Sequence, residues 1–345
     1  MAQELTERQK LLLTLIIHEY VRTAQPVGSQ YLVDHYSLSM SSATVRNEMA
    51  ALTEAGYLRQ PHTSAGRVPS EEGYRYFVSH LVRQTDLPAN TQRTISHQFY
   101  QMRNDVEQWM RLAASVLAHQ SRSASLVTSP HSEQPRLKHM ELIGTRGRQA
   151  LMVVVLLGGD IHQQILTLPE PVPQEQLSQV ASHLTQLFQG KDVEAIRPLT
   201  LQLEALEKDL SEALMHEIDQ GDSLIAGEVY MDGLSNVLSE PEFSNSTEAR
   251  RALRLLEERS KLEDLLARTI VANNVGGVQV LIGGEGTWED LRQFSVVLAR
   301  YGQPGLAMGT LGVLGPMRMP YGRAISTVRF VSNLLSDMVA ETLGD

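Results

Sequence analysis

The sequence contains no cysteine, few aromatic residues and no long apolar segment. Phe, Trp and Tyr make up only 5% of its 345 residues. The absence of cysteine excludes disulfides, thiolate catalysis and cysteine-based zinc sites. The longest unbroken apolar run, residues 150–157, is far shorter than the roughly 20 residues that span a bilayer. The N-terminus is amphipathic and charged, unlike a signal peptide, so we expect a cytoplasmic protein with no membrane partner.

Motifs for catalysis and for metal binding are also missing. The 11 histidines lie at least 8 residues apart in the sequence, so no local His-x-His or His-x-x-x-His pair exists. The glycines at 276, 277, 283, 284 and 286 form neither a dinucleotide fingerprint nor a Walker sequence. Turns around a β-strand explain these glycines better. We therefore expect no enzyme activity, no catalytic residues, no metal and no cofactor.

Charge is distributed unevenly along the chain. The net charge is −10, yet residues 1–85 hold 8 Lys and Arg against 8 Asp and Glu, so the whole acidic excess lies in residues 86–345. A length of 345 residues with 42% hydrophobic and 20% charged residues is typical of two or three folded domains. The N-terminal module is therefore neutral and is joined to an acidic remainder.

The most informative segment is residues 41–58, which predicts a helix with two different faces. Serines at its start suit the N-cap, and Gly56 suits its end. One face is apolar and comprises Val45, Met49 and Leu52. The opposite face has small and polar side chains with a single basic residue, and comprises Ala43, Arg46, Asn47 and Ala50. A helix that enters the major groove needs little bulk and a few forked donors and acceptors. Arg suits guanine O6 and N7, and Asn suits adenine N6 and N7.

The flanking segments predict a winged helix-turn-helix. Residues 5–22 and 29–35 form helices by their apolar spacing, and the turn at 36–40 leads into the helix described above. Residues 57–60 form a strand, and residues 63–67 form a hairpin tip before the returning strand at Val68. This wing is short, polar and basic. Ser70, followed by two glutamates, starts a further helix.

Two interpretations of this segment are open. Helix-turn-helix geometry also occurs in purely structural domains, and a face of small residues is often a packing surface. The adjacent wing favours DNA binding, because Arg67 and short hydroxyl side chains can contact phosphates and fix the register on a duplex. The candidate DNA-binding residues are Ser41, Ser42, Ala43, Thr44, Arg46 and Asn47 on the helix, and His62, Thr63, Ser64, Gly66 and Arg67 on the wing.

Three ordered parts of the chain resemble the family of bacterial heat-inducible transcription repressors called HrcA. The first is residues 52–75, above all 61–69; the second is 229–236 with 241–243; the third is 281–285, 305–316 and 318–321. The resemblance implies a repressor that binds an inverted-repeat, CIRCE-type operator ahead of chaperone operons as a dimer. It also implies inactivation by heat and activity supported by the chaperonin GroEL.

The remainder of the sequence predicts a mixed sheet flanked by helices, and the resemblance implies a GAF-like fold for it. Strands are expected at residues 125–128, 138–144, 150–157, 163–168, 278–282, 294–299 and 307–313, and helices at 93–120, 174–189 and 325–343. The expected fold is α+β and multidomain. Residues 1–85 form the winged-helix DNA-binding domain, residues 86–198 and 271–345 a discontinuous GAF-like domain, and residues 199–270 an inserted helical dimerisation domain.

Helical patterns at 199–218 and 247–270 carry leucine stripes. The candidate dimerisation residues are Leu203, Leu206, Leu210, Leu214, Leu253 and Leu256. A helical hairpin on the domain's own core is one explanation. The resemblance implies instead an inserted domain that forms a homodimer, which we favour because two long stripes exceed what one small sheet covers. A neutral module on an acidic body binds DNA weakly without base contacts. Tight binding is thus expected only from a dimer on a two-fold symmetric double-stranded site. The alternative function is a winged-helix regulator gated by a small ligand in its GAF-like domain.

Overall fold

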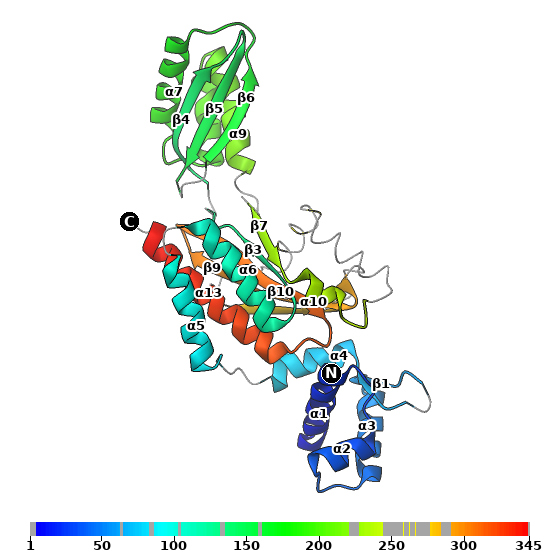
Figure 1. Ribbon diagram of the computed structural model, residues 1–345. Helices are drawn as coiled ribbons and strands as arrows, with labels where there is room; N and C mark the ends of the chain where they lie inside the picture. The colour runs from blue at the N-terminus through cyan, green and yellow to red at the C-terminus, as the bar shows by residue number, and fades with distance from the viewer. Residues whose placement is uncertain are drawn as a thin grey trace. The chain divides into compact units, whose positions relative to one another are not determined.

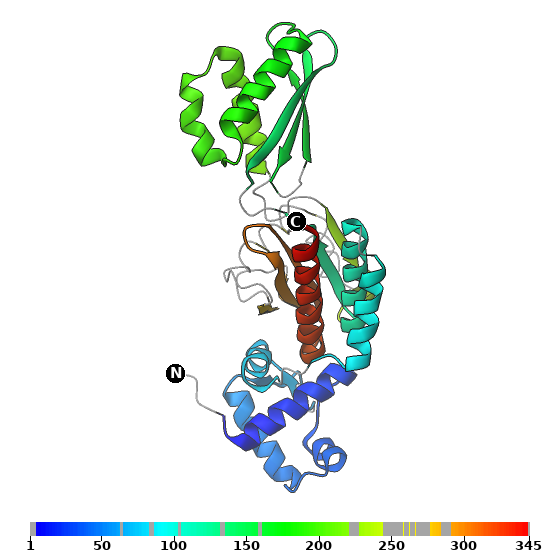
Figure 2. The ribbon, with the colours of Figure 1, turned by 90° about the vertical axis from the view of Figure 1, so that its left-hand side faces the viewer.

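The computed structural model is a mixed α/β protein (Figures 1 and 2). It describes residues 5–62, 65–82, 86–102, 105–131, 135–157, 161–220, 228–243, 258, 262, 266, 277–283 and 291–343. The chain divides into two compact units. Unit 1 comprises Met1–Val127, Tyr230–Arg300 and Leu311–Leu334, and unit 2 comprises Thr128–Val229, Tyr301–Thr310 and Leu335–Asp345.

The N-terminal part of unit 1 has the element order of a winged helix-turn-helix, as the sequence predicts. Its helices are α1 (Glu7–Thr23), α2 (Ser29–Tyr36), α3 (Ser42–Glu54) and α4 (Glu71–Tyr76), which continues into a π-helical turn, Phe77–Leu81; its strands are β1 (Leu58–Arg59) and β2 (Val68–Pro69). The side chains of Thr6, Ser41 and Ser70 accept hydrogen bonds from backbone N–H groups in the first turns of α1, α3 and α4. These caps satisfy donors that have no partner within a helix.

One apolar core holds these helices together. α1 contacts α3 and β2, and α2 contacts α3 (Figure 1). The most deeply buried side chains come from every helix of the module and include Leu12, Ile16, Leu32, Val45, Leu52 and Tyr74. Burial of a side chain of this size contributes about 1.5–3 kcal/mol. The module is therefore fixed by its own packing.

A five-stranded sheet with strand order β7-β3-β10-β9-β8 lies mostly in the second part of unit 1. The strands are β3 (Ala124–Thr128), β7 (Val229–Asp232), β8 (Val278–Ile282), β9 (Phe294–Gln303) and β10 (Ala307–Pro316). Helices α6 (Val106–Ser121) and α13 (Tyr321–Leu343) lie side by side on one face of this sheet (Figures 1 and 2). α5 (Ala89–Gln101) packs against α6, and the short α10 (Leu234–Leu238) follows β7. Every residue of β10 is buried, so this strand is the centre of the core.

The single long helix expected at 93–120 is wrong. α5 ends at Gln101, and α6 starts anew after Asp105, whose carboxylate accepts a hydrogen bond from the Gln108 backbone N–H at 3.1 Å. The Trp109 indole donates back to the Met102 carbonyl at 2.7 Å. An aspartate in an extended conformation is a strong N-cap, and it separates two helices whose apolar spacing looks continuous in the sequence.

Unit 2 contains a separate antiparallel sheet with strand order β4-β5-β6. Its elements are β4 (Leu137–Gly144), β5 (Gln149–Leu156), β6 (Ile161–Thr167), α7 (Gln174–Phe188), α8 (Val193–Ile196), a 3₁₀ turn (Arg197–Gln202) and α9 (Ala205–Gln220). α7 and α9 cover one face of the sheet (Figure 2). The strands expected from alternating apolar residues are confirmed, but they do not join the five-stranded sheet.

The structure corrects two expectations about residues 199–270: where the first helix begins, and what its leucines contact. The helix expected at 199–218 begins only at Ala205, since the 3₁₀ turn with Pro198 precedes it. Leu210 and Leu214 are 1% and 0% exposed and belong to the core between α9, α7 and the three-stranded sheet. The expectation that these two leucines face a second subunit is therefore corrected, because they are buried within their own chain. Leu203 and Leu206 are partly buried against the same core.

Other expectations fall outside the described part of the chain. Leu253 and Leu256 lie outside the described residues, as does most of the 247–270 pattern. Leu262 and Leu266, which belong to that pattern, are buried. Among the helices described, none combines the length and the apolar character needed to cross a membrane.

Candidate nucleic-acid interface

α3 presents the two faces that the sequence predicts. Val45, Met49 and Leu52 are buried against the module's core. Arg46 and Asn47 are exposed, and neither side chain forms a hydrogen bond with the described residues. Their donors and acceptors are thus available to a ligand. The small side chain of Ala43, one turn earlier, is also exposed.

Glu48 of α3 is turned towards α1, away from this exposed face. The Glu48 carboxylate accepts hydrogen bonds from the Arg8 guanidinium at 3.4 Å and from the Gln9 amide at 3.2 Å, both on α1. These contacts anchor α3 to α1. They also neutralise a carboxylate that would otherwise repel a phosphate backbone.

The wing is paired in the expected register and is attached to the chain before α2. Leu58 pairs with Pro69, and Arg59 pairs with Val68. The backbones of Val27 and Arg67 exchange two hydrogen bonds of 2.9 Å each. A Cβ atom at Gly66 would lie 2.3 Å from the Val27 carbonyl oxygen, so only glycine allows this approach. Gly66 therefore has a structural role in placing the wing beside α3.

Arg67, which the sequence predicts as a phosphate contact, is held by a hydrogen bond within the module. Its Nε donates to the Thr53 hydroxyl at 3.0 Å, and the residue is only partly exposed. The guanidinium is thereby held against the last turns of α3. An arginine fixed in this way loses less rotamer freedom when it binds a phosphate.

A hollow of about 380 Å³ lies between α3, the wing and the start of α2. Arg46, Arg67 and Gln60 line it, together with Gly28 and Ser29 at the N-terminus of α2. The unpaired N–H groups of a helix N-terminus favour anions, as do two guanidinium groups. Gly28, Ser29 and Gln60 were not among the expected DNA-binding residues. The start of the helix expected at 29–35 is the sequence feature that could have located Gly28 and Ser29.

The end of α1 carries a buried carboxylate that fixes the orientation of α2. Glu19 accepts hydrogen bonds from Arg22 at 2.8 and 3.0 Å, from the Tyr31 hydroxyl at 2.7 Å and from the Tyr36 hydroxyl at 3.4 Å. The hydrogen bonds from the Arg22 guanidinium lower the pKa of Glu19 from 4.5 to about 2. Nothing in the sequence pattern singled out this cluster, because its members are spread over 17 residues.

Within unit 1, two arginines connect the winged helix to the part of the chain that contains the five-stranded sheet. The Arg318 guanidinium donates to the Val21 carbonyl at 3.2 Å and pairs with Glu240 and Glu242. The Arg75 guanidinium donates to the Ile282 carbonyl at 3.3 Å. These contacts connect the winged-helix module to two of the segments that carried the family resemblance.

The remaining expected site residues lie on the wing and at the start of α3. His62 is exposed at the wing, whereas Thr63 and Ser64 lie outside the described residues. Ser41 is the N-cap of α3, so its hydroxyl already accepts the Thr44 N–H at 3.1 Å. Within the described ranges, no group of three or more His, Asp and Glu residues is arranged to hold a metal ion.

Comparisons with known proteins identify the family. Residues 107–325 match the model of the HrcA protein C-terminal domain. The chain is 45% identical to the heat-inducible transcription repressor HrcA of Roseiflexus castenholzii, over 100% of this chain and 97% of the relative. It is 41% identical to the repressor of the same name from Herpetosiphon aurantiacus, over 99% and 97% of the two chains.

A further relative and one solved structure agree with these matches. The HrcA repressor of Thermomicrobium roseum is 40% identical over 100% of this chain and 98% of its own. A crystal structure described only as that of a hypothetical protein is similar over 98% of both chains, with a TM-score of 0.58 and 24% identity. The structural match supports the fold alone. The sequence matches show that the chain belongs to the family of heat-inducible transcription repressors named HrcA.

Proposed function

We propose that this protein represses heat-shock operons in the cytoplasm by binding an inverted-repeat operator with α3 and the wing. The observation that carries the proposal is the exposed face of α3, where Arg46 and Asn47 have no partner among the described residues. A guanidinium can bind guanine O6 and N7, and a carboxamide can bind adenine N6 and N7. The hollow beside Arg46 and Arg67 suits a backbone phosphate.

Charge supports a requirement for two modules. Residues 1–85 carry no net charge, whereas the whole chain carries −10. Nonspecific affinity for DNA comes mainly from counterion release by phosphate contacts, and a neutral module supplies little of it. Two modules in a homodimer, on half-sites separated by about one helical turn or a multiple of it, combine their base contacts.

The three-stranded sheet offers the surface for that homodimer. Its face away from α7 and α9, here called the open face, is formed by nine side chains in three cross-strand rows: Ile143, Leu151 and Ile165; Glu141, Val153 and Gln163; and His139, Val155 and Ile161. Ile143, Ile161 and Ile165 are 46%, 61% and 66% exposed. Exposed apolar side chains gathered on one face mark an interaction site.

A second copy of this chain fits the open face best. β6 is an edge strand, and its row of exposed isoleucines can meet the same row of a partner about a two-fold axis. His139 and Glu141 lie in an outer row and in the central row of the face, and the His139 Nε2 lies 2.9 Å from the Glu141 carboxylate, so a polar pair borders the isoleucines. This surface replaces Leu210 and Leu214 in the proposed dimer, because those side chains are already buried.

We further assign a GAF-like role to the five-stranded sheet with α6 and α13, and a dimerisation role to the three-stranded sheet with α7 and α9. The family resemblance implies that heat inactivates the repressor and that the chaperonin GroEL supports its active fold. Both fit a protein whose stability is a small difference between large terms, of about 5–15 kcal/mol. Loss of the dimer would then release DNA before the winged helix itself unfolds.

A footprint on DNA upstream of the chaperone operons of the source organism tests the proposal. Purified protein is added with and without chaperonin, at low and at elevated temperature. The expected result is protection of two symmetric half-sites, strengthened by chaperonin and lost on heating. Protection of a single half-site by monomer at undiminished affinity, or no protection at all, would overturn it.

A further inference from the structure

Two hollows of about 530 Å³ and 540 Å³ meet beside the last turn of α6. Arg122, Arg323 and Glu240 line both of them. All the lining residues belong to unit 1. Part of the wall comes from residues 232–241 and 316–323, which include motifs that the DNA interface does not use.

Positive charge gathers around these hollows in a chain whose net charge is −10. Four arginines line them, Arg22, Arg122, Arg318 and Arg323, against the carboxylates of Asp232 and Glu240. Two of the four are already neutralised: Arg22 pairs with Glu19, and Arg318 pairs with Glu240 and Glu242.

The other two guanidinium groups have no carboxylate partner among the described residues. Arg122 is exposed and makes no side-chain hydrogen bond in that part of the chain. Arg323 donates only to the neutral Gln120 amide oxygen, at 3.0 Å. Arg122 also has a φ of +53°, a left-handed conformation that favours glycine. Two cations are therefore free at the place where the two hollows join.

The linings of the two hollows, which meet at Arg122 and Arg323, differ in polarity. The first hollow is partly apolar, with Pro241, Pro316, Met319 and Pro320 in its lining. The second is polar, with Ser115, Ser235, Asn236 and Ser239. Guanidinium groups bind phosphate oxygens in a bidentate manner. A ligand that fits both sides has adjacent phosphates and an apolar organic part.

We propose that the joined hollows bind a small organic diphosphate, such as a nucleoside diphosphate. Its phosphates contact Arg122 and Arg323, and its organic part lies against Met319 and the three prolines. Val21 lines the first hollow, and its carbonyl accepts a hydrogen bond from Arg318. The ligand therefore touches the end of the helix that leads into the DNA-binding module. Any effect of the ligand on DNA affinity is matched by an equal effect of DNA on ligand affinity.

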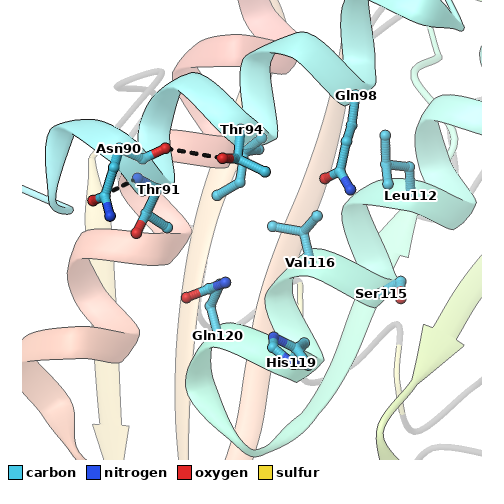
Figure 3. Close-up of a pocket in the computed structure, with 10 residues that line it drawn as sticks. Asn90, Thr91, Thr94, Gln98, Leu112, Ser115, Val116, His119 and Gln120 are labelled. Atoms are coloured by element: carbon cyan, nitrogen blue, oxygen red, sulfur yellow. Dashed lines mark hydrogen bonds between the residues drawn. The ribbon is translucent and has the colours of Figure 1, made fainter.

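A third hollow, of about 450 Å³, lies between α5 and α6 and provides a contrast. Figure 3 shows its lining, in which Asn90, Thr94 and Gln98 of α5 face Val116 and His119 of α6. No arginine or lysine lines it. It shares Gln120 with the first hollow, yet it lacks the pair of free cations that a diphosphate needs.

Calorimetric titration of the full chain with ADP, and separately with pyrophosphate, tests the proposal. No DNA is present, so the outcome does not depend on the proposed function. The test variant is Arg122→Ala with Arg323→Ala. The matched control is Arg8→Ala with Arg146→Ala, which removes the same charge from two exposed positions elsewhere. Unfolding curves without ligand check that both variants fold.

We expect ADP to bind the unmodified chain and the control with a Kd below about 1 mM, and the test variant at least about tenfold more weakly. Pyrophosphate should bind more weakly than ADP, because it lacks the organic part. Equal ADP affinity in the two double variants, or no ADP binding at about 5 mM, would overturn the proposal. Pyrophosphate that binds as tightly as ADP would contradict the apolar contact.

Discussion

The Arg318 guanidinium donates a hydrogen bond to the Val21 carbonyl oxygen at 3.2 Å, which joins two residues 297 positions apart in the chain. Val21 lies in the last turn of α1, where carbonyl groups lack a partner within the helix. The same guanidinium is 11% exposed and pairs with Glu240 and Glu242. One side chain thus links the winged-helix module with the residues that precede α13 and follow α10.

Replacing Arg318 by Ala should lower the free energy of unfolding by roughly 2–4 kcal/mol, because it leaves two partly buried carboxylates without their cation. The value stays below that of a fully buried pair, since Glu240 and Glu242 are 28% and 26% exposed. Urea unfolding measures the change. The control is Arg8→Ala, which breaks the exposed pair with Glu48 and should cost less than about 1 kcal/mol. Equal losses in both variants would contradict a linking role for Arg318.

Gly66→Ala should disrupt the wing. The added Cβ would lie 2.3 Å from the Val27 carbonyl oxygen, which is closer than real contacts allow, so the paired hydrogen bonds between Val27 and Arg67 must break. We expect a loss of about 1–3 kcal/mol and faster amide exchange at Val27 and Arg67. Gly28→Ala is the matched control, because open space surrounds that position. Unchanged exchange at Arg67 in the Gly66 variant would show that the contact is dispensable.

Glu19 predicts a pH dependence of the module. Its pKa is about 2 in the folded protein against 4.5 as the ordinary value, chiefly because of Arg22. A lowered pKa means that the carboxylate form stabilises the fold, so the contribution is complete above about pH 4.5 and is lost as the pH falls towards 2. Glu19→Gln should lower the free energy of unfolding by about 1–3 kcal/mol at pH 7. The difference between the two proteins should shrink at pH 3; a constant difference would contradict the assignment.

Local features of the fold were predictable from the sequence. Serine caps, apolar spacing and alternating strands located α1 to α4, the wing and all three strands of unit 2, because these depend on neighbouring residues. The exposed face of α3 was likewise predictable from the positions of Arg46 and Asn47 in the sequence. The break before α6 was not predictable, because a capping aspartate such as Asp105 and a solvent-facing one differ only in their local geometry.

Long-range pairing was not predictable in the same way. Nothing in the strand pattern shows that β4 to β6 form their own sheet, because alternation specifies a face and not a partner strand. The leucines at 210 and 214 look the same whether they cover their own core or a second subunit. The contacts of Arg318 and of Arg67 join distant segments, so no spacing rule locates them.

Arg46→Ala should weaken operator binding by roughly 1–3 kcal/mol and relax specificity at one base pair, if this guanidinium reads guanine. Binding to operators altered at single positions measures the effect. Lys in place of Arg46 keeps the charge but not the fork, so it is the matched variant. A uniform loss across all operator sequences, with rescue by Lys, would make Arg46 a phosphate contact instead.

If the open face of the three-stranded sheet forms the dimer, charged substitutions on this face should prevent dimerisation. Ile161→Asp with Ile165→Asp puts two charges on β6, where both isoleucines are more than half exposed, so the folded monomer should tolerate them. Carboxylates buried between two copies would be costly. Sedimentation at micromolar concentration should therefore show a monomer for this variant and a dimer for the unmodified chain. Leu201→Asp is the control, since Leu201 is 80% exposed in the 3₁₀ turn and is not one of the nine open-face residues. Dimerisation that survives the isoleucine changes, or a stable monomer of the unmodified chain, would move the interface away from this sheet and leave tight operator binding without its proposed basis.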